Sequence, residues 1–235
     1  TLTGFEMLSS TVNNLSYGVL LDNISGSVLS RFDGVDFTNC IFGIRANNII
    51  NLSFFNHLLI SNVNINGSFS GIDIANSGFV ILNNVNVISS THAVRAINSG
   101  VIGSINCNYS GSPVAAVLLE QVNGFYMIDG RIHDNAIGIG GDMSDVWLRN
   151  GAKIDNNGIG VALLGQPGDY AMLTVGDVGC GWIYNNVVAG VVGQELILNI
   201  DAELHACNAG DCSNIEPNRF DENGAFTFFI TYTAP

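Results

Sequence analysis

Two acidic residues occupy equivalent places in a repeated sequence pattern. Glu120 and Asp142 each lie four residues after a small residue, Ala116 and Gly138, that is followed by a β-branched one. If these small residues mark successive coils of a stack, the two carboxylates are neighbours on adjacent strands, about 5 Å apart. That separation suits the two carboxyl groups of a retaining glycosidase, and carbonyl oxygens beside them would complete a Ca²⁺ site. The alternative is a pair of solvated acidic side chains where two strands end.

The segment "MIDGRIHDN" holds the densest polar cluster of the chain. Alternation along a strand would place Asp129, Arg131 and His133 together on one outer face. These side chains could bind a glycan or a partner protein. The alternative interpretation is a solvated strand face.

A column of opposite charges is predicted from the residue that follows each β-branched position. Arg45, Asp73 and Arg95 share this place on three successive coils and should stack as a plus-minus-plus ladder. As solvated ion pairs they would contribute about 0.2–1 kcal/mol each. The alternative is a charged patch that binds a glycan or a partner.

The elements that position these residues are the coils of an internal repeat. A small residue followed by a β-branched one recurs at intervals of 22 to 30 residues. The occurrences are Gly18-Val19, Gly43-Ile44, Gly71-Ile72, Ala93-Val94, Ala116-Val117, Gly138-Ile139, Gly160-Val161 and Gly190-Val191. Such self-similarity predicts a solenoid, and alternation without a helical period indicates that its coils are built from strands.

A second pair of inward-facing positions precedes these small residues. The pairs are Val35/Phe37, Val63/Ile65, Val85/Val87, Cys107/Tyr109, Gly130/Ile132, Ala152/Ile154 and Trp182/Tyr184. The second member lies six residues before the small residue, except for Tyr109, which lies seven before Ala116. Constant spacing predicts two short strands in fixed register, because a slip of one residue would turn core side chains outward.

The pattern resembles the right-handed parallel β-helix superfamily, which has the pectin-lyase-like fold. The resemblance covers residues 15–195 and rests on phrases such as "SGFVILNNVNVISS" and "SDVWLRNGAKIDNNGIGV". The predicted fold class is all-β, a single-stranded right-handed parallel β-helix solenoid with about eight coils of about 22 residues. Residues 1–195 should form the coils and 196–235 a C-terminal cap, where "AFTFFITYTAP" would be a capping strand or hairpin.

Asparagine marks one predicted corner of the coil. In "IDNNGIGVAL", Asn156 precedes the small residue Gly160 by four positions, as Asn186 precedes Gly190. Asparagine tolerates left-handed backbone and hydrogen-bonds locally. The motif is therefore predicted to be a turn between two strands rather than a ligand site.

Two further outward columns follow from the register. One column consists of Asp36, Asn64, Asn86, Asn108, Arg131, Lys153 and Ile183. Within it, the side chains of Asn64, Asn86 and Asn108 are expected to form an amide ladder. The other continues the Arg45 column as a smooth apolar strip of Leu118, Gly140, Ala162 and Val192. Such a strip is a predicted surface for self-association or a larger assembly.

Composition limits the choice of partners. Seven basic against 20 acidic residues give a net charge of −13, which argues against nucleic acids and anionic membranes. Membrane insertion is not expected, because no apolar run is long enough to cross a bilayer. We expect no cofactor, apart from Ca²⁺ if acidic side chains gather.

The five cysteines divide into two groups. Cys207 and Cys212, in "CNAGDC", are close enough to suggest a small disulfide loop in the cap. Cys40, Cys107 and Cys180 lie in apolar patterns, and we expect buried thiols there rather than metal ligands.

These features predict a non-catalytic module on the outside of a cell or a virion. It would act as a rigid rod that binds glycans or sister subunits, as in an adhesin, surface fibre or tail spike. The alternative is a polysaccharide lyase or glycoside hydrolase of the β-helix superfamily, although the Ser-His-Gly and Arg-Ile-Lys motifs of polygalacturonase-like families are absent. An ice-binding or purely structural solenoid is a third hypothesis, and the outward columns lack the regular Thr rows it requires.

Overall fold

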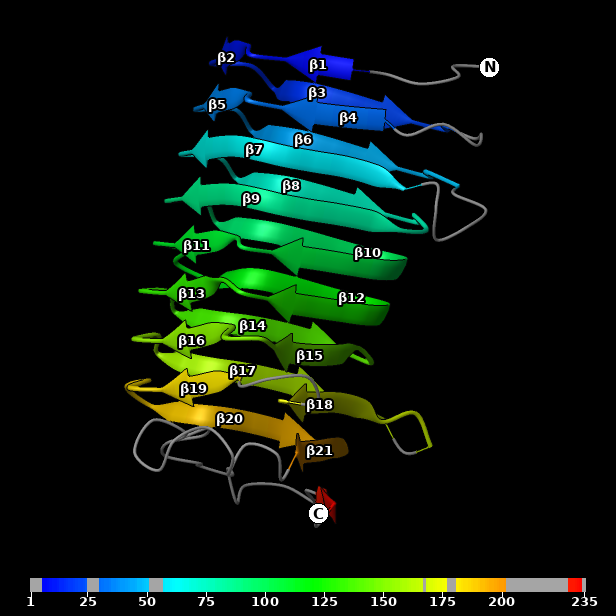
Figure 1. The fold of residues 1–235 in the computed structure, drawn as a ribbon, viewed down its shortest axis with the longest axis vertical. Helices are drawn as coiled ribbons and strands as arrows, with labels where there is room; N and C mark the ends of the chain where they lie inside the picture. The colour runs from blue at the N-terminus through cyan, green and yellow to red at the C-terminus, as the bar shows by residue number, and fades with distance from the viewer. Residues whose placement is uncertain are drawn as a thin grey trace.

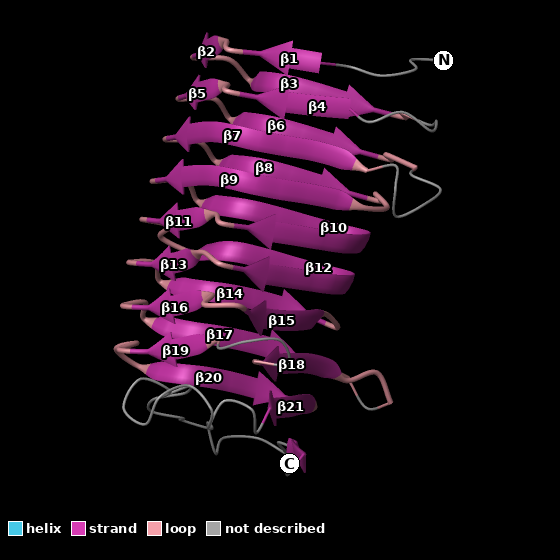
Figure 2. Cartoon of the chain, viewed as in Figure 1, coloured by secondary structure: helices cyan, strands magenta, loops and turns pink. Residues whose placement is uncertain are grey.

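The computed structural model describes residues 6–24, 30–50, 57–166, 168–176, 181–201 and 228–233. Within these ranges the chain is all-β and winds into a β-solenoid of about eight turns, which confirms the predicted coil stack. Figures 1 and 2 show the coils stacked along one axis, with β1 (Glu6–Leu8) near one end of the stack and β21 (Leu196–Asp201) near the other. No helix in the described ranges is long and apolar enough to cross a membrane.

Each coil contributes strands to three faces, which we number in the order that the chain visits them after Tyr17. Face 1 contains β3 (Tyr17–Asp22), β6 (Phe42–Asn47), β8 (Ser70–Ala75), the first halves of β10 (His92–Ile105) and β12 (Ala115–Ile128), β14 (Ile137–Asp142), β17 (Ile159–Leu164) and β20 (Ala189–Gln194). Its register aligns the β-branched markers from Val19 to Val191, as predicted.

Face 2 contains β1 (Glu6–Leu8), β4 (Ser30–Asp33), the first halves of β7 (Leu58–Asn66) and β9 (Val80–Ile88), the second halves of β10 and β12, β15 (Asp145–Arg149), β18 (Ala171–Val175), β21 (Leu196–Asp201) and β22 (Phe228–Thr233). The strand expected near the C-terminus is present as β22, which pairs in parallel with β21.

Face 3 contains the shortest strands of the coil. They are β2 (Thr11–Asn13), β5 (Asp36–Thr38), the second halves of β7 and β9, β11 (Asn108–Ser110), β13 (Arg131–His133), β16 (Lys153–Asp155) and β19 (Trp182–Tyr184). The core lies between the three faces and is filled by buried side chains from each of them, such as Ile44, Phe32 and Phe37.

The small marker residues of face 1 allow stacked backbones to approach closely. A Cβ atom at Gly160 would lie 2.5 Å from the carbonyl oxygen of Gly190, and one at Gly138 would lie 2.5 Å from that of Gly160. No side chain fits at such a distance. Close backbone approach, rather than turn geometry, therefore explains the glycine at these two marker positions.

Asparagine occupies left-handed corners, as predicted for "IDNNGIGVAL". Asn39, Asn156 and Asn185 have φ values of 53°, 55° and 54° at the corner between faces 3 and 1. The next residue points inward there: Asn157 is fully buried, and its side-chain nitrogen donates to Oδ1 of Asn186 at 3.0 Å. The corner is thus both a turn and a buried amide ladder.

The predicted inward pair Trp182/Tyr184 is wrong by one residue. Ile183 pairs with the buried Ile154 and is itself buried, so Trp182 and Tyr184 face outward. The outward column accordingly ends in Trp182 rather than Ile183. The cause is one additional residue in the following corner, which also makes Asn185, not Asn186, the equivalent of Asn156.

Candidate functional site

The outer surface of face 2 carries a column of large side chains that is interrupted once. Its members are Leu59, Ile81, Gly103, Tyr126 and Trp147, paired in this order from β7 to β15. Each precedes or follows buried residues on its strand, so all five face outward. Glycine in the middle of the column leaves a gap between Ile81 and Tyr126.

The gap at Gly103 is open space. A Cβ atom built there would have a single neighbour, Cγ1 of Ile81, at 3.9 Å. Strands of a sheet lie about 4.8 Å apart, so the strands of Ile81 and Tyr126 are separated by roughly 9.6 Å. A ring-sized ligand could lie over Gly103 without displacing any side chain.

Two aromatic rings form one wall beside this gap. Tyr126 and Trp147 stack with their centroids 4.4 Å apart and their planes 6° apart. A Cβ at Gly124 would lie 2.9 Å from the Tyr126 ring, so the absence of a side chain there allows the rings to pack against the backbone of Gly124. The guanidinium of Arg149 lies 4.8 Å from the centre of the Tyr126 ring, in the range of a cation–π contact.

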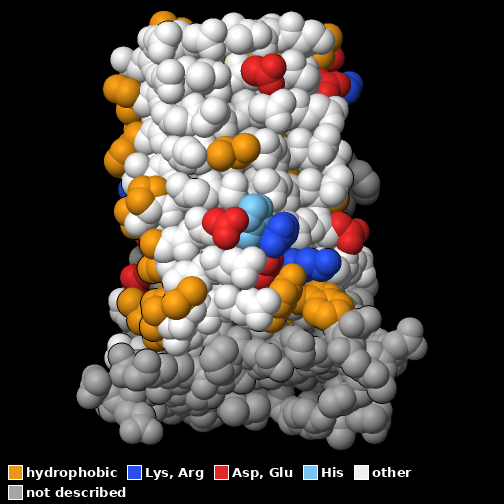
Figure 3. Space-filling model, turned by 90° about the vertical axis from the view of Figure 1, so that its left-hand side faces the viewer, with side chains coloured by type: hydrophobic (Ala, Val, Ile, Leu, Met, Phe, Trp, Pro, Cys, Tyr) orange, Lys and Arg blue, Asp and Glu red, His pale blue; other side chains and the backbone are white. Residues whose placement is uncertain are grey.

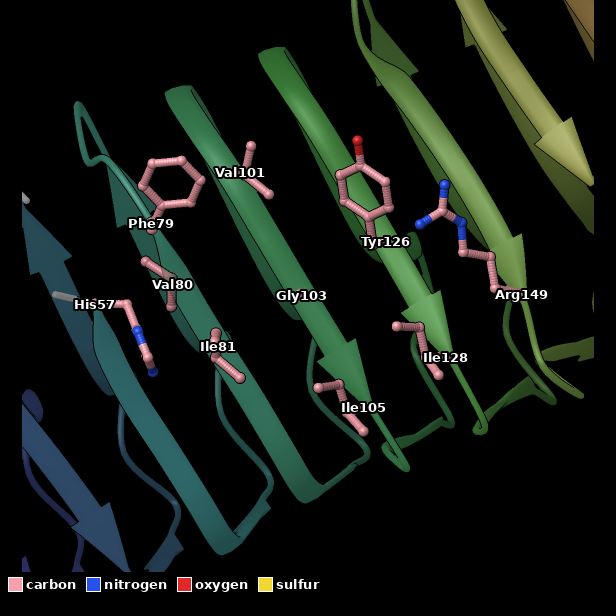
Figure 4. A pocket seen from close by; sticks show the side chains of 10 residues that line it. All are labelled: His57, Phe79, Val80, Ile81, Val101, Gly103, Ile105, Tyr126, Ile128 and Arg149. Carbon is pink, nitrogen blue, oxygen red and sulfur yellow. The ribbon is translucent and has the colours of Figure 1, made fainter. Parts of the chain in front are cut away.

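The whole hollow, which we call the face 2 groove, has a volume of about 440 Å³. Figure 4 shows its lining, with a bare stretch of β10 at Gly103 between Ile81 on β9 and Tyr126 on β12. The lining residues are His57, Phe79, Val80, Ile81, Val101, Gly103, Ile105, Tyr126, Ile128 and Arg149. An apolar floor with a few polar groups at its margins is typical of a small-molecule site.

The predicted charge ladder is present on the outer surface of face 1. Oδ2 of Asp73 lies 3.3 Å from Nε of Arg45, and its Oδ1 lies 3.3 Å from Nη1 of Arg95. The Asp73 side chain is buried, whereas both arginines remain about one-third exposed. The Arg45 guanidinium also lies 5.0 Å from the centre of the Phe42 ring. These charges thus satisfy one another within the chain.

The polar cluster of face 3 is only partly assembled as predicted. Arg131 and His133 lie on β13 and face outward, but Asp129 precedes the strand at a left-handed corner with φ 44°. Arg131 donates from Nε to Asp155 Oδ1 at 2.8 Å, a contact that raises the pKa of Arg131 further. Asp155 is almost fully buried and was not among the predicted site residues.

His133 makes two contacts on this face. Its Nδ1 lies 2.6 Å from the Asp134 carboxylate, and its Nε2 lies 3.0 Å from Oδ1 of Asn108. Asn108 also donates to Asn86 Oδ1 at 2.9 Å, as the predicted amide ladder requires. His133 therefore joins the ladder to the charged part of face 3.

The acidic pair lies in the predicted register. Glu120 and Asp142 are paired residues on β12 and β14, and both side chains are half-buried. Within the described residues, no group of three or more His, Cys, Asp or Glu side chains is arranged to hold a metal ion. The pair therefore offers two carboxylates on one outer face.

The remaining predicted residues fall into three groups. Leu118, Gly140, Ala162 and Val192 are aligned on face 1 as expected, though none is strongly exposed. Cys40 and Cys107 are free and buried, which confirms the expectation for those two thiols. Cys180 and the predicted disulfide Cys207–Cys212 lie outside the described residues.

The face 2 groove was not found from the sequence. A usable signal was present, because Tyr126 and Trp147 directly follow the apolar residues Phe125 and Val146 in successive coils. The repeat pattern aligned only the strands of faces 1 and 3. The face 2 strands lie in the stretch of variable length, so their register stayed undefined until the coils were stacked.

The fold and its outer faces define a β-solenoid with an aromatic-lined groove on one face. Searches against protein-family models, curated proteins and solved structures find no significant match for this chain. Function must therefore be argued from the surface chemistry of the faces themselves.

Proposed function

We propose that the chain is a non-catalytic β-helix module that binds glycan in the face 2 groove. In this proposal the chain belongs to the pectin-lyase-like superfamily and acts outside the cell or on a virion, as part of an adhesin, surface fibre or tail spike. The stacked coils supply a stiff rod, because each coil buries its apolar side chains against its neighbours. The groove supplies the binding function.

The observation that carries the proposal is the gap at Gly103 beside the Tyr126–Trp147 stack. A pyranose ring has one apolar C–H face and a rim of hydroxyl groups. The apolar face would lie over Gly103 and Ile105 and against Tyr126, while the hydroxyls would meet the polar groups of His57 and Arg149 at the margins. Aromatic side chains suit such a ligand because they combine apolar area with few rotatable bonds.

A substitution that fills the gap tests this assignment. Gly103→Val adds carbon atoms where only Ile81 is nearby, so the fold should persist while the ligand is excluded. The control is Gly140→Ala on face 1, where a Cβ has only ordinary contacts of 3.8 Å. Both variants and the parent chain would be screened on a glycan array, and each array hit would be confirmed by calorimetry.

We expect any glycan bound by the parent to bind the Gly140→Ala variant equally and the Gly103→Val variant at least about tenfold more weakly, a loss of roughly 1.4 kcal/mol. Equal binding by a folded Gly103→Val variant would place the ligand elsewhere. Absence of any hit for the parent chain on a broad array would remove the glycan proposal.

The enzyme hypothesis depends on a different observation, the pairing of Glu120 with Asp142. It predicts release of reducing ends or unsaturated products from a polysaccharide, and loss of that release in Glu120→Gln and Asp142→Asn variants. The assays would be run with Ca²⁺ and with a chelator. Sustained turnover that these variants abolish would replace the non-catalytic proposal.

Self-association is the second part of the proposed function. Besides the face 1 strip, exposed apolar side chains follow the corner between faces 3 and 1, among them Ile41, Phe69, Val114 and Val187. Figure 3 shows hydrophobic side chains along one edge of the molecule. Sedimentation of the parent chain and of a Phe69→Ser variant would test whether sister chains associate there, with a shift to the monomer expected for the variant.

A further inference from the structure

The outer column of face 3 changes character halfway along the rod. In the first coils it is a polar ladder without net positive charge, where Asn64 donates to Asp36 at 2.8 Å and Asn108 donates to Asn86 at 2.9 Å. The next members are Arg131, Lys153 and Trp182, paired in this order. Two cations therefore follow one another on adjacent strands, and an aromatic ring comes directly after them.

This basic pair, Arg131 and Lys153, is unusual in so acidic a chain. The whole sequence has seven Lys and Arg residues and a net charge of −13. Figure 3 shows Lys and Arg side chains gathered beside a histidine on this side of the molecule, with acidic and hydrophobic side chains around them.

The two cations differ in how they are held. Arg131 is fixed by Asp155, which uses the Nε and Nη2 donors of the guanidinium and leaves the other N–H groups available. Lys153 is exposed and is absent from the ion pairs formed among the described residues. A buried carboxylate thus orients one cation, while the second remains open to a ligand.

We infer that Arg131, Lys153 and Trp182 form a subsite for a saccharide that carries an anionic substituent. A carboxylate or sulfate would accept hydrogen bonds from Lys153 and from the remaining N–H groups of Arg131. The sugar ring would pack against Trp182. Asp134, beside His133, and the overall negative charge select sparsely charged ligands over polyanions.

This subsite is separate from the face 2 groove and does not depend on it. Asp129 stands at the corner between them, with Oδ1 3.1 Å from the position of a Cβ at Gly151. An anionic group would be repelled at that corner. The two sites can therefore be occupied and tested independently.

The two tryptophans of the chain allow the sites to be read separately. Trp147 lies in the groove wall and Trp182 in the proposed subsite, and the sequence contains no other tryptophan. In a Trp147→Phe variant the fluorescence reports Trp182, and in a Trp182→Phe variant it reports Trp147. The probes are a uronic acid trisaccharide, the matching neutral trisaccharide and inorganic sulfate, at constant ionic strength.

In the Trp147→Phe background we expect the uronic acid trisaccharide to change Trp182 emission and to bind about tenfold more tightly than the neutral one, as one charge-assisted hydrogen bond would give. Adding Lys153→Gln should abolish this preference, and Lys153→Arg should retain it. Arg31→Gln, which removes a distant cation, should leave it unchanged.

Three outcomes would overturn the subsite: equal binding of the acidic and neutral trisaccharides, a preference that survives Lys153→Gln, or sulfate binding as tightly as the acidic sugar. Lys153 is exposed, so its variants should fold, and circular dichroism would check this. A fluorescence response in the Trp182→Phe protein with none in the Trp147→Phe protein would support the groove and reject the subsite. A response in the Trp147→Phe protein with none in the Trp182→Phe protein would support the subsite and reject the groove.

Discussion

Face 1 contains glycine in several coils and face 2 contains Gly103 once in its outer column, for opposite physical reasons. At Gly160 on face 1 the carbonyl oxygen of the next coil lies 2.5 Å from where a Cβ would be, so glycine is required by the packing. At Gly103 on face 2 a Cβ would have one neighbour at 3.9 Å, so glycine leaves a space that the packing does not need. The first glycine supports the fold, whereas the second creates a hollow on its surface.

A similar contrast holds for the charged and aromatic side chains on the outer surfaces of the two faces. On face 1 the charges of Arg45, Asp73 and Arg95 are paired with one another. On face 2 the Tyr126–Trp147 stack borders an open groove. The two outer surfaces therefore differ in whether their side chains fill the space between neighbouring coils or leave it open.

The largest effect on stability should come from adding a side chain at the closely packed glycine of face 1. Gly160→Val would force its side chain against the Gly190 carbonyl, the Asn186 amide and Ile183. We expect the free energy of unfolding to fall by about 3 kcal/mol or more, measured by urea denaturation. Gly103→Val is the matched control, with an expected change of no more than about 0.5 kcal/mol. Similar losses for the two variants would contradict the distinction.

The buried amide ladder beside face 1 should give the next largest effect. Asn157→Ala removes the side chain that bonds to Asn135 and Asn186, and it leaves their polar atoms without these partners. We expect a loss of about 2–3 kcal/mol in the free energy of unfolding. Asn156→Ala, at the neighbouring exposed corner with φ 55°, should cost less. The reverse order would indicate that the corner conformation matters more than the ladder.

Breaking the ion pairs of face 1 should have a smaller effect. Asp73→Asn removes the charge that Arg45 and Arg95 share, and both arginines are partly exposed to solvent. We expect about 1 kcal/mol of destabilisation, which high salt should reduce. Chemical denaturation with urea at two salt concentrations measures this. An equal loss at both concentrations would argue that packing around Asp73, rather than charge, is responsible.

The smallest expected effect is a dependence of stability on pH that arises from His92 on face 1. Burial is the main cause that lowers the pKa of His92 below its usual value of 6.5. The unfolded chain therefore binds a proton that the folded chain resists, so stability should be constant above about pH 7 and fall as the pH drops below 6.5 toward the lowered pKa. His92→Gln should flatten this part of the profile in thermal unfolding. If the slope of stability against pH were unchanged in this variant, carboxylates rather than His92 would be its cause.

The alignment of faces 1 and 3 could be predicted because each inward residue there is tied to a nearby marker. Val161 follows Gly160 directly, and Ile154 precedes it by six residues, so short-range spacing suffices. The same rule failed at Ile183, where the following corner is one residue longer. Apolar residues at three successive positions, Trp182 to Tyr184, gave no local indication of which one is buried.

The candidate sites were predicted less well, and the reason is physical. Alternation indicates which side chains point outward, such as Arg45 and Arg131, but it does not show what lies between neighbouring coils. Asp155 was missed because an aspartate beside a corner asparagine is typical of a solvated turn. Its burial beneath Arg131 depends on the coil above.

The sequence by itself determined the coil, because the alternation of apolar residues and the recurrence of small residues depend only on neighbours along the chain. Stacking decided everything that involves two coils at once. It placed Gly103 between Ile81 and Tyr126, set Lys153 beside Arg131, and buried Asp155 and Asn157. These contacts join residues about 20 or more positions apart, and the variable loops between them conceal their register until the backbones are paired.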